Sequence, residues 1–149
     1  MFNLILSAEP YKISEKIFYL GEIPRLTGFE SQTTSFVFED FTPDYVRDDS
    51  GIVFILPEGL FVITGCGHAG VVNTLEHAKK ITGINTLYGI MGGFHMKEIN
   101  PQTKETFRYL KENNLKHIFP SHCTELPALA AFYSTFGVKL IKTGDILEL

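Results

Sequence analysis

Short apolar runs separated by polar stretches occupy residues 1–64 and have the β-branched and aromatic composition of strands. Pro57-Glu58-Gly59 joins the last two runs and is typical of a tight turn, so these runs predict a β-hairpin. Two long polar stretches between the runs predict extended loops, which are usually functional or packed on a partner. The predicted strands cover residues 2–7, 16–20, 35–39, 51–56 and 60–64, and the predicted loops cover 21–34 and 40–50.

The pattern changes to alternating strands and helices over residues 65–149. Val71, Leu75, Ala78 and Ile81 recur at helical spacing and define the apolar face of the first helix. Asn-Pro begins the second helix, and glycine is expected to end the first and the third. The predicted helices cover 70–82, 101–113 and 127–136, with Asn100 as an N-cap and Gly83 and Gly137 as C-caps, and the predicted strands cover 87–91, 117–120, 139–142 and 145–149.

Composition favours one α/β (α+β) domain over residues 1–149, with a β-rich first part followed by three strand–helix units. The chain is 44% hydrophobic and 20% charged, and no Pro/Gly/Ser linker divides it. Its net charge of −4 excludes a general nucleic-acid-binding surface. No apolar run approaches the ~20 residues of a membrane span, and Glu9 and Pro10 interrupt the opening apolar run, so we expect a cytoplasmic protein without a signal peptide.

Each of the three strand-to-helix junctions carries a histidine just after its strand: His68 in GCGHAG, His95 in GGFH and His122 in PSHCT. Successive β-α-β units give parallel strands whose carboxyl ends lie at one edge of the sheet, where ligands bind. Histidine is the commonest zinc ligand, and three imidazoles leave a fourth position open for water. The spacing therefore predicts that the three rings meet and hold zinc or another divalent metal such as manganese or iron.

Cys66 and Cys123 each lie within two residues of a predicted ligand and are candidates for additional thiolate ligands. The simpler interpretation is that they are small buried residues at strand ends, and a catalytic Cys–His pair is a third possibility. Two cysteines are too few for a disulfide scaffold, which agrees with a reducing compartment.

Other polar residues have weaker claims to a functional role. Asp48-Asp49 could supply a carboxylate ligand or a salt bridge, although a solvated turn is the favoured interpretation. Arg25 is a candidate substrate-binding residue for an anionic group such as phosphate, with a surface-loop arginine as the alternative. We expect His77 at the surface of a helix and His117 at the opposite rim, neither of them as a ligand.

Five segments together resemble the C-terminal part of metallo-β-lactamase-fold hydrolases, most closely the dihydropterin–aminobenzene ribofuranosyl phosphate synthase branch. The resemblance covers nearly all of the chain and implies half of an αββα sandwich with a dinuclear metal site at the rim between its halves. It also implies that His68 matches the third metal motif, His95 stands where many relatives carry a bridging Asp, and His122 matches the final His motif. The segments are 21–30, 43–54, 63–83, 92–95 and 120–125.

The signature H-x-H-x-D-H of that family's N-terminal half does not occur in this sequence. The resemblance therefore implies a metal-binding, hydrolase-like half that acts on a small, phosphorylated or ester-bearing substrate only when a separate N-terminal-half chain completes it. A second interpretation is a truncated, non-catalytic metal-binding or scaffold protein that forms a homo-oligomer through its exposed sheet face. A third is a gene-model fragment, and a fourth is a protein whose three histidines bind phosphate or a cofactor without metal.

Overall fold

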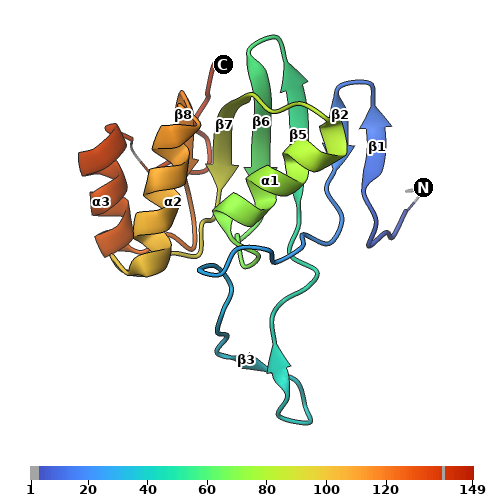
Figure 1. The fold of residues 1–149 in the computed structure, drawn as a ribbon, viewed down its shortest axis with the longest axis vertical. Coiled ribbons are helices and arrows are strands. Elements are labelled where there is room, and N and C mark those ends of the chain that lie inside the picture. Colours follow the sequence, from blue (N-terminus) through green and yellow to red (C-terminus); the bar gives the residue numbers. More distant parts are fainter. Residues whose placement is uncertain (1–3, 139) are drawn as a thin grey trace.

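A computed structural model of the chain describes residues 4–138 and 140–149 and consists of a mixed β-sheet with helices packed on it (Figure 1). Six strands lie in the order β1-β2-β5-β6-β7-β8, and β3 and β4 form a separate two-stranded sheet. Neighbours from β1 to β6 are antiparallel, whereas β6, β7 and β8 are parallel. The elements are β1 (Tyr11–Ser14), β2 (Ile17–Tyr19), β3 (Phe36–Val37), β4 (Pro43–Asp44), β5 (Gly51–Leu56), β6 (Gly59–Thr64), α1 (Val71–Thr82), β7 (Leu87–Gly92), α2 (Pro101–Glu112), β8 (His117–Pro120) and α3 (Leu126–Phe136).

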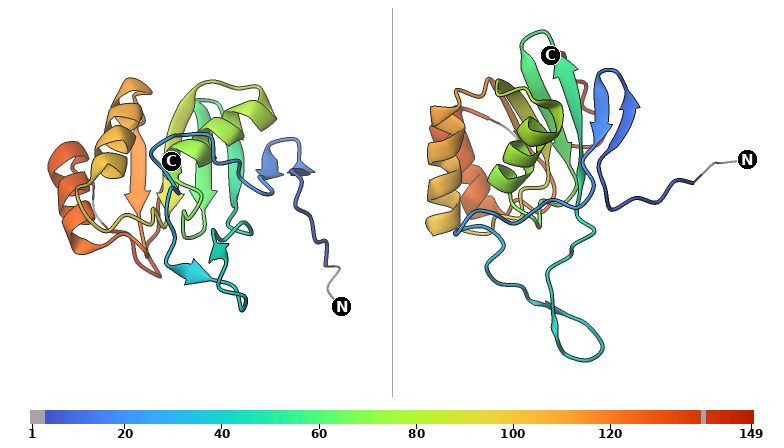
Figure 2. Two further views of the ribbon diagram at one scale, coloured as in Figure 1. Left: turned by 60° about the horizontal axis from the view of Figure 1, so that its bottom comes forward. Right: turned by 45° about the vertical axis from the view of Figure 1, so that its right-hand side comes forward.

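All three helices pack on the same face of the large sheet (Figure 2). Side chains alternate between the two faces along a strand, so the paired residues Val53, Val62 and Ile90 share one face, where they are fully buried in the core. Their neighbours Ile52 and Ile63 form a paired row on the opposite face and are only half-buried. Within the described residues, no helix covers that opposite face (Figure 2).

The sequence pattern predicts the regular elements of the second part well. Asn100 accepts a hydrogen bond from the backbone N–H of Thr103 at the start of α2, as expected for an N-cap. Gly83 and Gly137 end α1 and α3 in the left-handed conformation. None of the helices in the described part of the chain is long and apolar enough to cross a membrane.

Three strands predicted at the ends of the chain are absent from the residues that the structure describes. Residues 4–7 of the predicted first strand extend away from the sheet and pair with no strand (Figure 2), so Leu4 and Leu6 stay exposed. Residues 140–142 and 145–149 also form no strand; the N–H of Ile141 donates to the carbonyl of Pro120, and Lys142 begins a turn instead. Residues 2, 3 and 139 of these predictions lie outside the described part.

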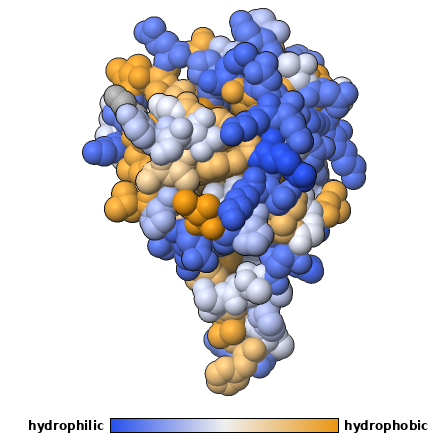
Figure 3. Space-filling view, turned by 60° about the vertical axis from the view of Figure 1, so that its left-hand side comes forward, coloured by the Kyte–Doolittle hydropathy of each residue, from blue (hydrophilic) through white to orange (hydrophobic). Residues whose placement is uncertain are grey.

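Strands β3 and β4 form an arm, residues 33–46, that projects from the body of the molecule (Figures 1 and 3). β3 lies within the predicted strand 35–39. β1 and β4 have no predicted counterpart. The exposed fractions of Phe36, Val37, Phe38 and Phe41 range from 44% to 85%, so the arm carries apolar surface outside the core.

Candidate functional site

The loops that follow β6, β7 and β8 lie side by side at one rim of the sheet and carry His68, His95 and His122. Backbone hydrogen bonds continue past the strand ends, because the N–H of Gly93 donates to the carbonyl of Gly65 at 2.8 Å. The shared carboxyl ends of parallel strands thus bring these loops together as the sequence predicts.

Glycine permits this close approach of the loops. A Cβ at Gly92 would lie 2.2 Å from the backbone oxygen of Thr64, and one at Gly93 would lie 2.9 Å from the Cα of Cys66 and 2.9 Å from the carbonyl oxygen of His122. Because the atoms in the way belong to the backbone, a larger residue could not be accommodated by moving a side chain.

His68 and His95 form a histidine pair, with ring centroids 4.1 Å apart. The ring of Phe36, at the base of the arm, contacts His68 edge-on at 5.5 Å. His95 has a φ of 46°, a left-handed conformation that is uncommon for a residue with a side chain. Burial lowers the pKa of His95, and the positive charges of His68 and Lys97 lower it further. A neutral imidazole is the form that binds a metal, so this environment favours ligation.

A cavity of about 610 Å³ opens beside the histidine pair, between the loop at 28–36 and the start of α2. Hydroxyl and amide side chains from residues 31–35 line it, together with the aromatic rings of Phe36 and Tyr45. Lys97 and Glu98 add one positive and one negative charge to its lining. Such a lining can hydrogen-bond a polar ligand and stack on a ring.

Cys66, His122 and Cys123 form a second group, here called the thiol cluster. One donor atom from each of them lies within 4.8 Å of the others, and the Sγ of Cys66 is 3.5 Å from the Nε2 of His122. Both cysteines are free thiols. Burial raises the pKa of the Cys66 thiol, and the neighbouring Cys123 and Asp49 raise it further.

The three predicted imidazole ligands are therefore divided between two groups on adjacent loops. Of the residues that the structure describes, His122 belongs to the thiol cluster, whereas His68 and His95 join no set of three donors within 4.8 Å of one another. The shared rim agrees with the sequence analysis, and the ligand assignments remain predictions.

Asp49 fixes the turn that carries His68. Its carboxylate is buried, with 8% of the residue exposed, and accepts hydrogen bonds from the backbone N–H groups of Gly67 at 3.3 Å and Ala69 at 2.9 Å. The favoured expectation of a solvated turn at Asp48-Asp49 is thus wrong for Asp49. Because β5 is antiparallel to β6, the residues just before β5 reach the rim at which β6 ends.

Glu30 and Asn73 fix the start of α1, where the N-cap residue Gly70 has no side chain to cap the helix. The carboxylate of Glu30 is fully buried and accepts the N–H groups of Val72 at 2.9 Å and Asn73 at 2.8 Å. The Asn73 side chain accepts two backbone N–H groups of the 21–34 loop and donates to the carbonyl of Ala69. The sequence analysis does not identify these residues, and an acidic residue about 40 positions before a helix gives no local signal of its capping role.

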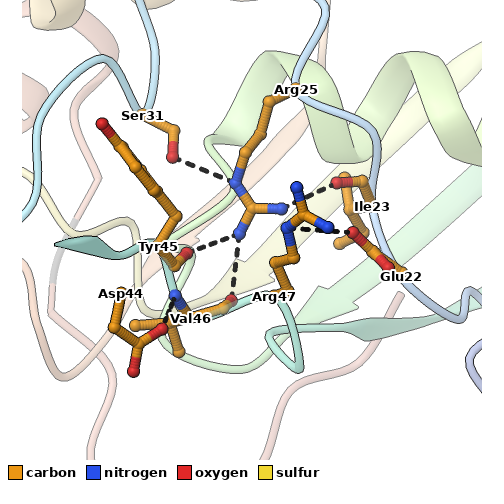
Figure 4. Close-up of polar contacts among 8 residues, drawn as sticks. All are labelled: Glu22, Ile23, Arg25, Ser31, Asp44, Tyr45, Val46 and Arg47. Atoms are coloured by element: carbon orange, nitrogen blue, oxygen red, sulfur yellow. Dashed lines mark hydrogen bonds and ion pairs between the residues drawn. The ribbon is translucent and has the colours of Figure 1, made fainter. Parts of the chain in front are cut away.

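Arg25 holds the arm to the body rather than facing the cavity (Figure 4). Its guanidinium donates to Ser31 Oγ at 3.1 Å and to the carbonyl oxygens of Ile23, Tyr45 and Val46 at 3.2, 2.7 and 2.9 Å. These hydrogen bonds use four of the five N–H donors of the guanidinium and leave one for a bound anion. Lys97 is instead the cationic side chain among the described lining residues.

The two remaining histidines lie away from the rim. His77 is half-buried, and its Nε2 lies 3.0 Å from the carbonyl oxygen of Leu20, so the expectation of a surface position is wrong. Burial lowers its pKa. His117 lies at the start of β8, with its ring centroid 4.5 Å from that of Tyr88.

No protein-family model matches the chain. The 7,8-dihydropterin-6-methyl-4-(beta-D-ribofuranosyl)-aminobenzene-5'-phosphate synthase of Methanocaldococcus jannaschii is 32% identical over 153 residues, an alignment that covers 97% of the chain and 52% of the synthase. An uncharacterized protein of the same organism is 33% identical over 129 residues, covering 85% of the chain and 47% of that protein. The chain therefore spans about half the length of the curated relatives it matches.

Among solved structures, the chain is similar to the crystal structure of Tm1679, a metal-dependent hydrolase of the β-lactamase superfamily. The TM-score is 0.80 at 24% sequence identity, over 99% of the chain and 58% of Tm1679. At this identity the similarity shows the fold.

Proposed function

Because this chain has the metallo-β-lactamase fold, we propose that its strand-end rim binds a divalent metal ion and contributes to metal-dependent hydrolysis or a related transfer reaction. The observation that carries the proposal is that three adjacent parallel strands each end in a loop with a histidine, His68, His95 or His122. Imidazole donors suit zinc and iron, and the thiols of the same rim favour zinc.

A metal ion held at this rim supplies two effects, a lowered pKa of a bound water and polarisation of a phosphoryl or carbonyl group. The chain's own residues bind and orient the substrate. Hydroxyl and amide groups of residues 31–35 hydrogen-bond a ligand in the cavity, directly beside the histidine pair. Asp49 holds the His68 turn in place through its two backbone hydrogen bonds.

The substrate class that we propose is a phosphorylated small molecule that contains an aromatic ring. The cavity supports this class because Phe36 and Tyr45 offer ring surfaces and Lys97 offers a positive charge. The similarity to the synthase supports it as well, because that enzyme's name contains an aminobenzene group and a ribofuranosyl phosphate.

In this proposal, turnover requires the part of the fold that the relatives have and this chain lacks. The same polypeptide or a companion chain would supply that part. The alignments with this chain cover 58% of Tm1679 and 52% of the synthase. The uncovered sheet face, which includes Ile52 and Ile63, is the surface on which we expect that part to pack. We therefore expect the chain alone to bind metal without hydrolysing a generic phosphodiester.

Metal content of the purified chain tests the proposal. We expect at least one zinc or iron per chain by plasma mass spectrometry, and a clear loss of metal in at least one of His68→Ala, His95→Ala and His122→Ala. His117→Ala is the matched control, because this histidine lies at the other end of β8. A metal-free chain, or unchanged metal content in all three rim variants, would overturn the proposal.

A second function is favoured by the uncovered sheet face: a metal-binding scaffold in which two copies of the chain pack through Ile63, Met91 and their neighbours. Both side chains are half-buried and paired across β6 and β7. Light scattering should then give a dimer that Ile63→Lys and Met91→Lys dissociate, whereas Leu26→Lys, at an exposed loop position, leaves it intact. A monomeric wild-type chain would exclude this second function.

A further inference from the structure

The thiol cluster has the donor chemistry and spacing of a metal site. Two thiols and one imidazole, from Cys66, Cys123 and His122, present donor atoms that all lie within 4.8 Å of one another. His122 and Cys123 are exposed, so an ion can enter from solvent, whereas Cys66 is partly buried. Neither cysteine is part of a disulfide.

The distance between Cys66 and His122 fits a tetrahedral zinc ion. With Zn–S of about 2.3 Å and Zn–N of about 2.0 Å, tetrahedral angles place sulfur and nitrogen about 3.5 Å apart. The Sγ of Cys66 and the Nε2 of His122 are 3.5 Å apart. The separation of these two donor atoms therefore matches that of two ligands of one zinc ion.

The fold holds the three residues together across an intervening strand. Cys66 follows β6 and His122 follows β8, and the loop after β7 passes between them. A Cβ at Gly93 in that loop would lie 2.9 Å from the Cα of Cys66 and 2.9 Å from the carbonyl oxygen of His122, so glycine lets the two residues approach this closely. Cys123 directly follows His122 in the sequence and adopts a left-handed backbone conformation with a φ of 57°.

We propose that Cys66, His122 and Cys123 form a thiolate-containing site for zinc, with a fourth coordination position open to water or another ligand. This inference rests on the proposed function, because it concerns the same rim, and it deepens that function by assigning the ion to sulfur donors. The histidine pair then remains available to a ligand in the cavity or to a second ion.

Cobalt(II) is the probe that tests the sulfur assignment. Cobalt bound by thiolate absorbs intensely in the near-ultraviolet through sulfur-to-metal charge transfer, whereas cobalt bound by imidazole alone does not. We expect one equivalent of cobalt to produce this band in the reduced chain under a non-thiol reductant, and one equivalent of zinc to abolish it. Zinc should also protect both thiols from a thiol-specific reagent.

Variants separate this inference from the proposed function. Cys123→Ser and Cys66→Ser should each weaken the band strongly, and the double variant should abolish it, with folding checked by circular dichroism. Cys123 is exposed, so its variant keeps the test valid even if Cys66→Ser fails to fold. His68→Ala is the matched control and should retain the band.

Three outcomes would overturn the sulfur assignment, and they differ in what they say about the proposed function. If cobalt binds without producing the band, and His68→Ala abolishes that binding, thiolate ligation is excluded and the proposed function stands. A band that survives the double cysteine variant would lead to the same conclusion. No cobalt or zinc binding at all would contradict both proposals together.

Discussion

The carboxylate of Asp49 accepts the backbone N–H of Ala69 at 2.9 Å and so fixes the residue that directly follows His68. It also accepts the N–H of Gly67, which precedes His68. One buried side chain thus holds the turn of a predicted ligand from both sides. The position of the His68 ring consequently depends on a carboxylate whose hydrogen bonds go to the flanking backbone and not to the ring.

Removing this carboxylate should destabilise the fold. Hydrogen bonds to a charged group each contribute about 1.5–3 kcal/mol, so we expect Asp49→Ala to lower the free energy of unfolding by about 2 kcal/mol or more. Asp49→Asn keeps one acceptor oxygen and should lose less. Urea denaturation measures the effect, with the exposed neighbour Asp48→Ala as control. Equal losses at positions 48 and 49 would contradict the assignment.

Adding a methyl group at Gly93 should separate the loops after β6 and β8. The new Cβ would lie 2.8 Å from the carbonyl oxygen of Gly65 and 2.9 Å from the Cα of Cys66, and backbone atoms cannot move aside cheaply. We expect Gly93→Ala to cost about 2 kcal/mol and to weaken metal binding. Gly28→Ala is the control for stability, because a Cβ at that position meets no atom within 4 Å. A Gly93→Ala chain as stable as the control would contradict the packing described above.

Glu30 should make stability fall as the pH rises. Burial raises its pKa above the ordinary value of 4.5, so the folded chain keeps this proton over a pH range in which the unfolded chain has lost it. The free energy of unfolding of the wild type, relative to that of Glu30→Gln, should therefore decrease from pH 4.5 upward until the raised pKa is passed. Denaturation curves at several pH values give this difference. If the free energy of unfolding of the wild type, relative to that of Glu30→Gln, instead increases with pH, the raised pKa of Glu30 is refuted.

His77 should show the opposite dependence. Burial lowers its pKa below 6.5, so below that pH the unfolded chain takes up a proton more readily and stability is lost as the pH falls. Because Nε2 lies 3.0 Å from the Leu20 carbonyl oxygen, we expect a neutral ring with its proton on Nε2. Nitrogen NMR reports both the tautomer and the titration midpoint. A midpoint above 6.5, or a proton on Nδ1, would disagree with this geometry.

Local signals explain how much of the fold the sequence predicts. The helix after β7 begins at an Asn-Pro pair and the helices before β7 and after β8 end at glycine, so neighbouring residues alone define their limits. The predicted metallo-β-lactamase fold is confirmed by the similarity to Tm1679. The strand predicted at 2–7, which does not form over the described residues 4–7, has the right composition. A strand also needs a partner, and the pattern of one segment does not say whether a neighbour will be present.

The site is predicted less completely because its supports are distant in sequence. The rim position of His68, His95 and His122 follows from the alternation of strands and helices, which is a local pattern. The hydrogen bonds that Val72 N–H donates to Glu30 and that Ala69 N–H donates to Asp49 join residues 42 and 20 positions apart. Such long-range contacts leave no periodic trace, and only the three-dimensional arrangement reveals that Arg25 anchors the arm.

The two carboxylates that secure the segment around His68 also limit how this protein can be dissected. A fragment that starts at Gly51 would retain every predicted ligand and all three helices, but it would lack Glu30 and Asp49. The amides at Ala69, Val72 and Asn73 would then have lost their acceptors. The residues before β5, which contribute none of the predicted ligands, are thus part of the smallest unit in which the first of the three histidines can be correctly placed.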